Sequence, residues 1–373
     1  MNLPFSFQTR SDLDKVLCLM VDKQASDLHA GGDEPLRLRI HGEMQACSKR
    51  LLRGHDVEQM LLLAYDENTS AVARVRSGYE LDFSYQCLHP YQEALRRFRV
   101  NADLRQRFGR KDIKLVFRMI NPTPPSIESL ALPRSIVDTA MNLAQGMVIV
   151  AGATGSGKST LLASLLHHRL SHRVEHLVTL EAPIEYTYDE IESGSTVTAM
   201  EISSILGHAN FADALVSTLR KDPDIILVGE ARDKATLMAA IAGTQTGHAL
   251  FTTVHTNGVA ETIQRMIKAF DPKERDAMLW DLIDALSMVI YQTLVPCEQG
   301  GRVAIREYLI FDEGMKNTLR HQSAEKLTLT MNELLRNHGI PLAKDAQEKL
   351  SAGQISVATF ENLLRSTDRT LTR

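Results

Sequence analysis

Residues 147–160 of the chain read MVIVAGATGSGKST, and this stretch decides the fold. Its first five residues are apolar and rich in β-branched side chains, which favours a buried strand. Residues 152–159 then match the pattern GxxxxGK[ST], and a helical period over 161–170 follows. In a strand, glycine-rich loop and helix arranged in this order, backbone N–H groups wrap phosphate oxygens. We therefore predict that the chain binds and hydrolyses ATP.

The glycines, the lysine and the serine of the loop have different predicted roles. Glycines keep side chains out of the way of the phosphates. Lys158 is expected to reach the outer phosphates as a point charge, and the Ser159 hydroxyl to complete the shell of a magnesium ion that otherwise keeps waters. The predicted site for ATP and Mg²⁺ consists of Gly152, Ala153, Thr154, Gly155, Ser156, Gly157, Lys158, Ser159 and Thr160.

Three carboxylates downstream are candidates for the chemistry. Glu230 lies just beyond an apolar run at 225–228, where open α/β sheets present their ligands. It is predicted to polarise the attacking water or to hold the metal shell, and the alternative is an ordinary surface glutamate. Glu181 and Glu185 follow the apolar run at 177–180 and are predicted to position magnesium or water from an outer shell. The alternative for this pair is a solvated turn around Pro183.

The sequence around the loop predicts two kinds of architecture. Apolar runs that alternate with helical periods indicate a mainly parallel sheet with helices on both faces, and they lie at 147–151, 177–180, 225–228 and 249–254. The first part of the chain instead mixes helical periods with short strand-like runs, which is typical of an α+β domain. Its helical periods are 11–23 and 57–64, and its strand-like runs are 36–40, 81–85 and 115–119.

Three prolines within residues 122–125 separate the two parts, because neither a helix nor a central strand continues through them. A length of 373 residues also exceeds what one hydrophobic core usually serves. We predict an N-terminal α+β domain at 1–121, a linker at 122–132, an ATPase core at 133–312 and a C-terminal helical segment at 313–373. Breaks at 339–341 and at Gly353 divide that last segment into several helices.

Composition excludes several classes of protein. With 44% apolar and 24% charged residues the chain is predicted to be folded, and a net charge of -4 gives no global positive field for nucleic acid. The four cysteines form no CxxC pair and are interpreted as reduced, individually buried thiols. The sequence starts without a secretory signal and has no apolar run near the roughly 18 residues of a membrane span. We therefore expect a cytoplasmic protein, with peripheral attachment to a membrane machine left open.

Basic residues gather in one place. Residues 96–118 contain nine Lys or Arg against two Asp. Three explanations compete, namely a solvated face, a nucleic-acid patch, and arginines that neutralise the γ-phosphate of ATP at a domain interface. The run contains only Phe98, Phe108 and Phe117 at hydrophobic spacing, so it lacks the interleaved aromatics that stack on exposed bases. Direct binding of nucleic acid is not expected.

Four motifs in order along about 110 residues resemble those of the secretion ATPase superfamily, which includes motors of type II secretion, type IV pili and type IV secretion. They correspond to that family's Walker A, Asp box, Walker B and His box, at 152–160, 179–185, 222–233 and 246–257. The resemblance implies a P-loop NTPase (RecA-like) α/β domain, preceded by a smaller α+β PAS-like N-terminal domain. It also implies a role in nucleotide sensing or between subunits for His255, whereas His248 and His29 are read as structural.

The resemblance extends into the N-terminal part. Residues 25–29, with Arg37, Arg39 and Gly42, are similar to the family's sensor-like domain. Residues 97–101 and 116–118 resemble the segments from which that domain projects arginine fingers, which assigns the finger role to Arg99 and Arg118. A charge brought in by domain closure would couple hydrolysis to movement.

One departure from the family pattern indicates which branch of the superfamily the chain resembles most. Most relatives carry aspartate where this chain has Ala182, so the work of the Asp box would fall to Glu181 and Glu185. An alanine followed by Pro-Ile-Glu-Tyr resembles the type IVB branch, which comprises DotB-like secretion and TraJ-like conjugation ATPases. The missing cysteine tetrad argues against the type II secretion assembly ATPases, which carry a zinc-binding insertion.

The resemblance implies a homo-hexameric motor that works with inner-membrane components of a secretion or conjugation machine, at the inner face of the cytoplasmic membrane. Two alternatives stay open. One is a type IV pilus retraction ATPase with the same fold and chemistry, because 301–304 is similar to that branch. The other is a DNA-binding transfer protein whose ATP site is regulatory, which the basic run at 96–118 motivates.

Overall fold

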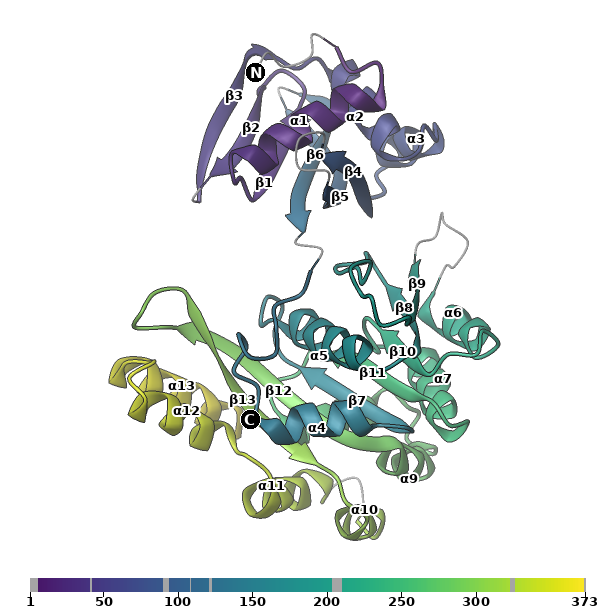
Figure 1. The fold of residues 1–373 in the computed structure, drawn as a ribbon, viewed down its shortest axis with the longest axis vertical. Helices are drawn as coiled ribbons and strands as arrows, with labels where there is room; N and C mark the ends of the chain where they lie inside the picture. The colour runs from purple at the N-terminus through teal and green to yellow at the C-terminus, as the bar shows by residue number, and fades with distance from the viewer. Residues whose placement is uncertain are drawn as a thin grey trace. The chain divides into compact units, whose positions relative to one another are not determined.

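A computed structural model describes residues 6–40, 42–89, 94–107, 109–120, 123–202, 210–322 and 326–371. The chain divides into two compact units (Figure 1). The N-terminal unit comprises Met1–Thr123 and Ala182–Thr187, and the second unit comprises Pro124–Glu181 and Tyr188–Arg373. The division falls just before Pro124. Ile127 and Leu132, which lie within the predicted linker, pack against a core of the second unit.

The N-terminal unit is an antiparallel sheet with three helices. Its strands are β1 (Asp27–Gly31), β2 (Pro35–Ile40), β3 (Glu43–Leu51), β4 (Leu81–His89), β5 (Ala94–Arg107) and β6 (Arg110–Ile120), and its helices are α1 (Arg10–Asp22), α2 (Gly54–Ala64) and α3 (Ser70–Arg76). The strand order is β3-β2-β1-β6-β5-β4. Alternate residues of β4 are buried, as expected for a sheet with one face on the core. Thr9 and Asp12 form a capping box at the start of α1.

The second unit is built on a seven-stranded sheet of order β13-β12-β7-β11-β10-β8-β9. Its strands are β7 (Gly146–Ala151), β8 (His176–Glu181), β9 (Thr196–Glu201), β10 (Ile225–Val228), β11 (Ala249–Val254), β12 (Leu286–Pro296) and β13 (Arg302–Ile310). Every pairing is parallel except that of β12 with β13. The predicted mainly parallel sheet is thus confirmed, and the antiparallel hairpin β12–β13 is an addition that was not predicted.

Helices cover both faces of this sheet, as predicted. They are α4 (Arg134–Asn142), α5 (Lys158–His172), α6 (Phe211–Thr218), α7 (Lys234–Gln245), α8 (Val259–Lys268), α9 (Arg275–Ala285), α10 (Glu313–Arg320), α11 (Leu327–His338), α12 (Leu342–Ser351) and α13 (Val357–Leu371). Val148 and Val150 pack with α4 and α5 on one face, and Ile149 packs with α6 to α11 on the other. The central strands are apolar throughout because both of their faces are buried.

The last helices pack on the β12–β13 hairpin. A small core joins Val295 and Ile305 of the hairpin to Leu342 and Ala346 of α12. Asp312 caps α10 by accepting a hydrogen bond from the backbone N–H of Met315. Within the described ranges, the helices are too short or too polar to cross a lipid bilayer.

The interpretation of four reduced, individually buried cysteines is confirmed only in part. All four are free thiols, and Cys18 and Cys87 are buried, but these two thiols lie close to each other. Cys47 and Cys297 are only half-buried. The interpretation rested on their distance along the chain, whereas α1 packs against β4 and brings Cys18 to Cys87. Burial raises the pKa of both thiols, so neither is activated as a nucleophile.

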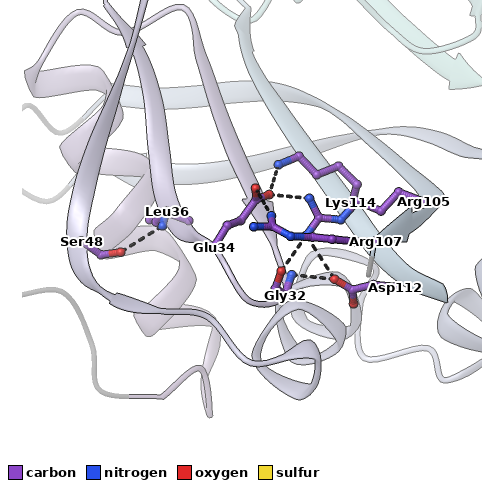
Figure 2. Close-up of polar contacts among 8 residues, drawn as sticks. All are labelled: Gly32, Glu34, Leu36, Ser48, Arg105, Arg107, Asp112 and Lys114. Carbon is purple, nitrogen blue, oxygen red and sulfur yellow. Dashed lines mark hydrogen bonds and ion pairs between the residues drawn. The ribbon is translucent and has the colours of Figure 1, made fainter. Parts of the chain in front are cut away.

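Much of the basic run at 96–118 is engaged inside the N-terminal unit. Glu34 accepts hydrogen bonds from Arg105 at 2.7 Å, from Arg107 at 2.8 Å and from Lys114 (Figure 2). Arg105 also donates to the carbonyl of Gly32. Burial opposes the ionisation of Glu34, but these cations outweigh it and hold the pKa of the carboxyl below its ordinary value. An internal ion-pair network, which was not among the three explanations from sequence, therefore accounts for several of these charges.

We expect Glu34→Gln to lower the free energy of unfolding of the N-terminal unit by about 2 kcal/mol at neutral pH, because three cations would lose their shared anion. The Glu34 side chain is only 13% exposed, so water replaces that anion poorly. Since its pKa is lowered on folding, the contribution is present above the ordinary glutamate pKa of about 4.3 and is lost as the pH falls through the folded value. Denaturant unfolding at pH 7 and pH 3 measures both effects.

The matched control is Glu43→Gln on β3, where the residue is exposed. It removes the same charge and should change stability by less than about 0.5 kcal/mol. Equal stabilities of Glu34→Gln and the unmodified chain at pH 7 would show that the network contributes nothing.

Candidate nucleotide-binding site

The candidate site lies where four parallel strands end on the same edge of the sheet. In the register, Val254 of β11 is opposite Ala151 of β7, and Val228 of β10 is opposite both Thr252 of β11 and Leu180 of β8. The residues that follow these strands are the P-loop after β7, His255 after β11, Glu230 after β10 and Glu181 at the end of β8. The sheet therefore gathers at one edge four segments that are spread over about a hundred residues.

The P-loop needs glycine at two positions for different reasons. A Cβ on Gly152 would lie 2.4 Å from the carbonyl oxygen of Gln292 and 2.4 Å from Ser156 Oγ, so no side chain fits there. Gly157 caps α5 with φ of 83°, in the left-handed region that side chains disfavour. Helix α5 then begins at Lys158, and the first turn of a helix has backbone N–H groups without intrahelical partners. The loop and this turn are suited to bind phosphate oxygens.

Lys158 lies across the loop. Its side-chain nitrogen donates to the carbonyls of Gly152 at 3.0 Å and Ala153 at 2.9 Å, and lies 3.4 Å from Nδ1 of His255. The residue is 7% exposed, so its charge acts in a poorly solvated position. The P-loop lysine and the histidine of the fourth motif are thus in contact.

Glu230 is held on the other side of His255. Its carboxylate is 3.6 Å from Nε2 of His255 and 3.4 Å from Nε of Arg232. The Glu230 side chain is 21% exposed, so water reaches it. Asp233 fixes the end of this loop, because it caps α7 by accepting the backbone N–H of Thr236 at 2.9 Å. Lys158, His255 and Glu230 therefore form a continuous polar chain at the sheet edge.

The backbone before Glu230 is packed closely against Glu181. The N–H of Gly229 donates to the carbonyl of Leu180 at 2.7 Å, and Thr253 donates its hydroxyl to the carbonyl of Gly229. A Cβ on Gly229 would lie 3.4 Å from the Cα of Glu181. Glu181 itself is 7% exposed. Gly229 and Arg232 lie within the predicted Walker B motif, but the sequence alone indicates no role for either residue. No sequence pattern indicates a role for Thr253.

The residues present fit a magnesium ion that is bound together with nucleotide phosphates. Among the described residues there is no group of three or more His, Cys, Asp or Glu side chains that could hold a metal ion. Mg²⁺ in phosphate sites keeps several waters and takes few protein ligands, so such a group is not required. Ser159, in the first turn of α5, offers the hydroxyl that this arrangement needs.

The other predicted catalytic residues belong to the N-terminal unit. Arg99 donates to Asp82 at 3.0 Å through Nε, and this hydrogen bond raises the pKa of Arg99. Arg118 donates to Asp27 at 2.7 Å. Burial opposes ionisation of Asp27, but Ser26 and Arg118 outweigh it and hold its pKa below the ordinary value. Glu185 lies in Ala182–Thr187, which is also part of this unit. The roles of these three residues at a nucleotide stay predictions.

Comparisons with known proteins agree with these features. A family profile described as "Type II/IV secretion system protein" matches residues 8–365. The type IV pilus retraction ATPase PilT of Pseudomonas aeruginosa is 33% identical over 85% of this chain and 87% of its own length. The crystal structure of the ATPase DotB of Legionella pneumophila is 33% identical, covers 98% of each chain and has a TM-score of 0.91. That of the pilus retraction motor PilT with bound ADP is 28% identical, covers 93% of this chain and 95% of its own, and has a TM-score of 0.79.

Proposed function

The chain belongs to the type II/IV secretion system protein family, and on this premise we propose that it is a magnesium-dependent ATPase that powers a type IVB secretion or conjugative transfer apparatus. The observation that carries the proposal is the contact chain from Lys158 through His255 to Glu230 at the carboxyl edge of a parallel sheet. A phosphate-binding lysine and a carboxylate that can accept a proton are groups that hydrolysis of a phosphoanhydride uses, and His255 lies between them.

The proposed role of each group in the site follows from its chemistry. Backbone N–H groups of 152–160 bind the phosphates and Lys158 neutralises their charge. Ser159 would hold the magnesium ion through its hydroxyl, and the ion would draw charge from the phosphates. Glu230 orients the attacking water and accepts its proton, while Glu181 and Glu185 support the water and the metal from further away. His255 contacts both Lys158 and Glu230, so it is suited to sense which nucleotide is present.

Arg99 and Arg118 are proposed to supply positive charge to the γ-phosphate when the PAS-like N-terminal domain closes. In the structure Arg99 pairs with Asp82 and Arg118 pairs with Asp27, so these carboxylates would compete with the γ-phosphate for the two arginines. Arg118 keeps 67% of its side chain exposed, so a phosphate can reach its guanidinium with little desolvation, and the buried Asp27 would keep Ser26 and Arg39 as partners. This exchange of anions would couple the state of the nucleotide to movement of the domain.

The proposed assembly is a homo-hexamer at the cytoplasmic face of the inner membrane, in contact with membrane components of the machine. Light scattering tests it by measuring particle mass with and without Mg-ATP. We expect a particle near six times the 41.6 kDa of one chain when nucleotide is present. A monomer at every nucleotide concentration would contradict the ring.

A pilus retraction ATPase is the second candidate, because PilT is as similar in sequence as DotB, at 33% identity. The wider coverage and higher TM-score of the Legionella pneumophila DotB structure favour the type IVB assignment. Neighbouring genes that encode pilin rather than conjugation or secretion components would favour retraction. A third candidate is a DNA-binding transfer protein with a regulatory ATP site, and only the basic run at 96–118 supports it. Salt-sensitive binding of DNA that stimulates ATP turnover would favour this candidate.

A further inference from the structure

A buried glutamine lies directly beneath the P-loop. Gln292 of β12 follows Tyr291, which pairs with Ala151 of β7, so it is level with the start of the loop. Its side-chain Nε2 donates to the carbonyl of Ser156 at 2.7 Å, and the residue is 3% exposed. A Cβ on Gly157 would lie 3.0 Å from the same Nε2. The loop therefore packs against Gln292 as well as accepting its hydrogen bond.

The amide of Gln292 has one orientation only. Nε of Arg306, the cross-strand neighbour on β13, donates to Oε1 of Gln292 at 2.8 Å. A guanidinium can only donate and the carbonyl of Ser156 can only accept. A flipped amide would set its NH2 group against the Nε–H of Arg306 and its oxygen against the carbonyl oxygen of Ser156, so Arg306 forces Nε2 toward the loop.

Arg306 is itself fixed from two further directions. One terminal nitrogen donates to the carbonyl of Leu130 at 3.1 Å, and its backbone N–H donates to Asp345 of α12 at 2.8 Å. Arg306 is 3% exposed. Burial lowers the pKa of its guanidinium, and the charge of Asp345 opposes that shift. A buried cation with this many fixed partners is a stiff support for the amide it contacts.

We propose that Gln292 is a positioning residue for the P-loop, and that Arg306 acts through it by fixing the orientation of its amide. The carbonyl of Ser156 is part of the turn whose neighbouring N–H groups would bind the phosphates in the proposed function. Holding that carbonyl fixes the direction of those N–H groups before nucleotide arrives, which reduces the ordering cost of binding. The inference rests on the proposed function, because it assigns the geometry of the same nucleotide site.

The test is the affinity for Mg-AMPPNP, measured by isothermal titration calorimetry, which does not depend on turnover. Gln292→Glu keeps the acceptor for Arg306 but sets a carboxylate oxygen against the carbonyl of Ser156, and we expect Kd to rise at least about tenfold. Gln292→Met keeps the shape and removes both hydrogen bonds, and we expect a rise of about fivefold. In steady-state ATP hydrolysis, KM should rise by similar factors while kcat changes by less than about threefold.

A merely structural role predicts a different pattern. It would lower the melting temperature and the amount of active protein, and so the apparent kcat, without changing Kd or KM. Gln347→Glu, an exposed substitution of the same chemistry on α12, is the matched control and should leave Kd unchanged. Wild-type Kd and KM in Gln292→Glu would overturn the inference while leaving the proposed function intact. Absence of nucleotide binding by the unmodified chain would overturn both.

The role of Arg306 is tested by a double-mutant cycle. If Arg306 acts through Gln292, Arg306→Met raises Kd in the unmodified chain and has no further effect in the Gln292→Met background. Effects on Kd that simply add would contradict this dependence. If Arg306→Met does not fold, Arg306→Lys keeps the charge but cannot donate from the Nε position, and the same cycle applies to it.

Discussion

Replacing Lys158 with alanine should reduce ATP hydrolysis by about 100-fold or more, because the developing charge on the phosphates loses its nearest fixed cation. In the structure Lys158 is 7% exposed, and its ammonium contacts two loop carbonyls and lies next to His255. Few waters are available to take its place. Phosphate release under saturating Mg-ATP measures the loss, and far-UV circular dichroism checks that the variant is folded.

Lys234→Ala is the matched control for this experiment. Lys234 is also the first residue of a helix, α7, but its side chain pairs with Asp271 and Glu274 on the surface. Removing these exposed ion pairs should cost little stability and no activity. Normal hydrolysis by Lys158→Ala would refute the assignment of the site, and equal losses in both variants would point to a general effect on folding.

Replacing Glu230 with glutamine should reduce kcat by about 100-fold to 10,000-fold while leaving ATP affinity within about threefold. The two processes use different groups, since the P-loop binds the phosphates and the carboxylate acts on water. Glu230 also lies near His255 and Arg232, so an amide at this position leaves more net positive charge near the phosphates. Affinity is therefore expected to stay equal or become slightly tighter.

Single-turnover hydrolysis and equilibrium binding separate these two quantities for Glu230→Gln. The matched control is Glu192→Gln, an exposed glutamate between β8 and β9, which should change neither. Loss of affinity in proportion to the loss of turnover would show that Glu230 shapes the binding site rather than the chemical step.

Much of the nucleotide site could be predicted because its residues follow buried strands in the sequence. Apolar runs of four to six residues identify β7, β8, β10 and β11, and parallel pairing brings the residues after them to one edge. The P-loop adds a backbone requirement that only glycine meets at Gly152. Local pattern and tertiary arrangement therefore agree at this site.

The parts that were missed depend on contacts between residues far apart in the chain. Glu34 and Lys114 are 80 positions apart, and the pairing of β1 with β6 brings the turn after β1, which carries Glu34, close to Lys114. Gln292 and Arg306 stabilise the P-loop from the β12–β13 hairpin, more than 130 positions beyond Ser156. Neither residue belongs to a motif with a spacing that chemistry dictates. A polar residue within an apolar strand is the signal that would have drawn attention to Gln292.

The central claim is that the P-loop binds the phosphate chain of a magnesium nucleotide, and its most direct test is calorimetric titration of the purified chain with Mg-ATP, Mg-ADP and AMP. The loop N–H groups and Lys158 contact outer phosphates in this account. We therefore predict measurable binding of ATP and ADP, with AMP weaker by about 100-fold or more. No binding of any of the three, or AMP binding as tightly as ATP, would contradict it.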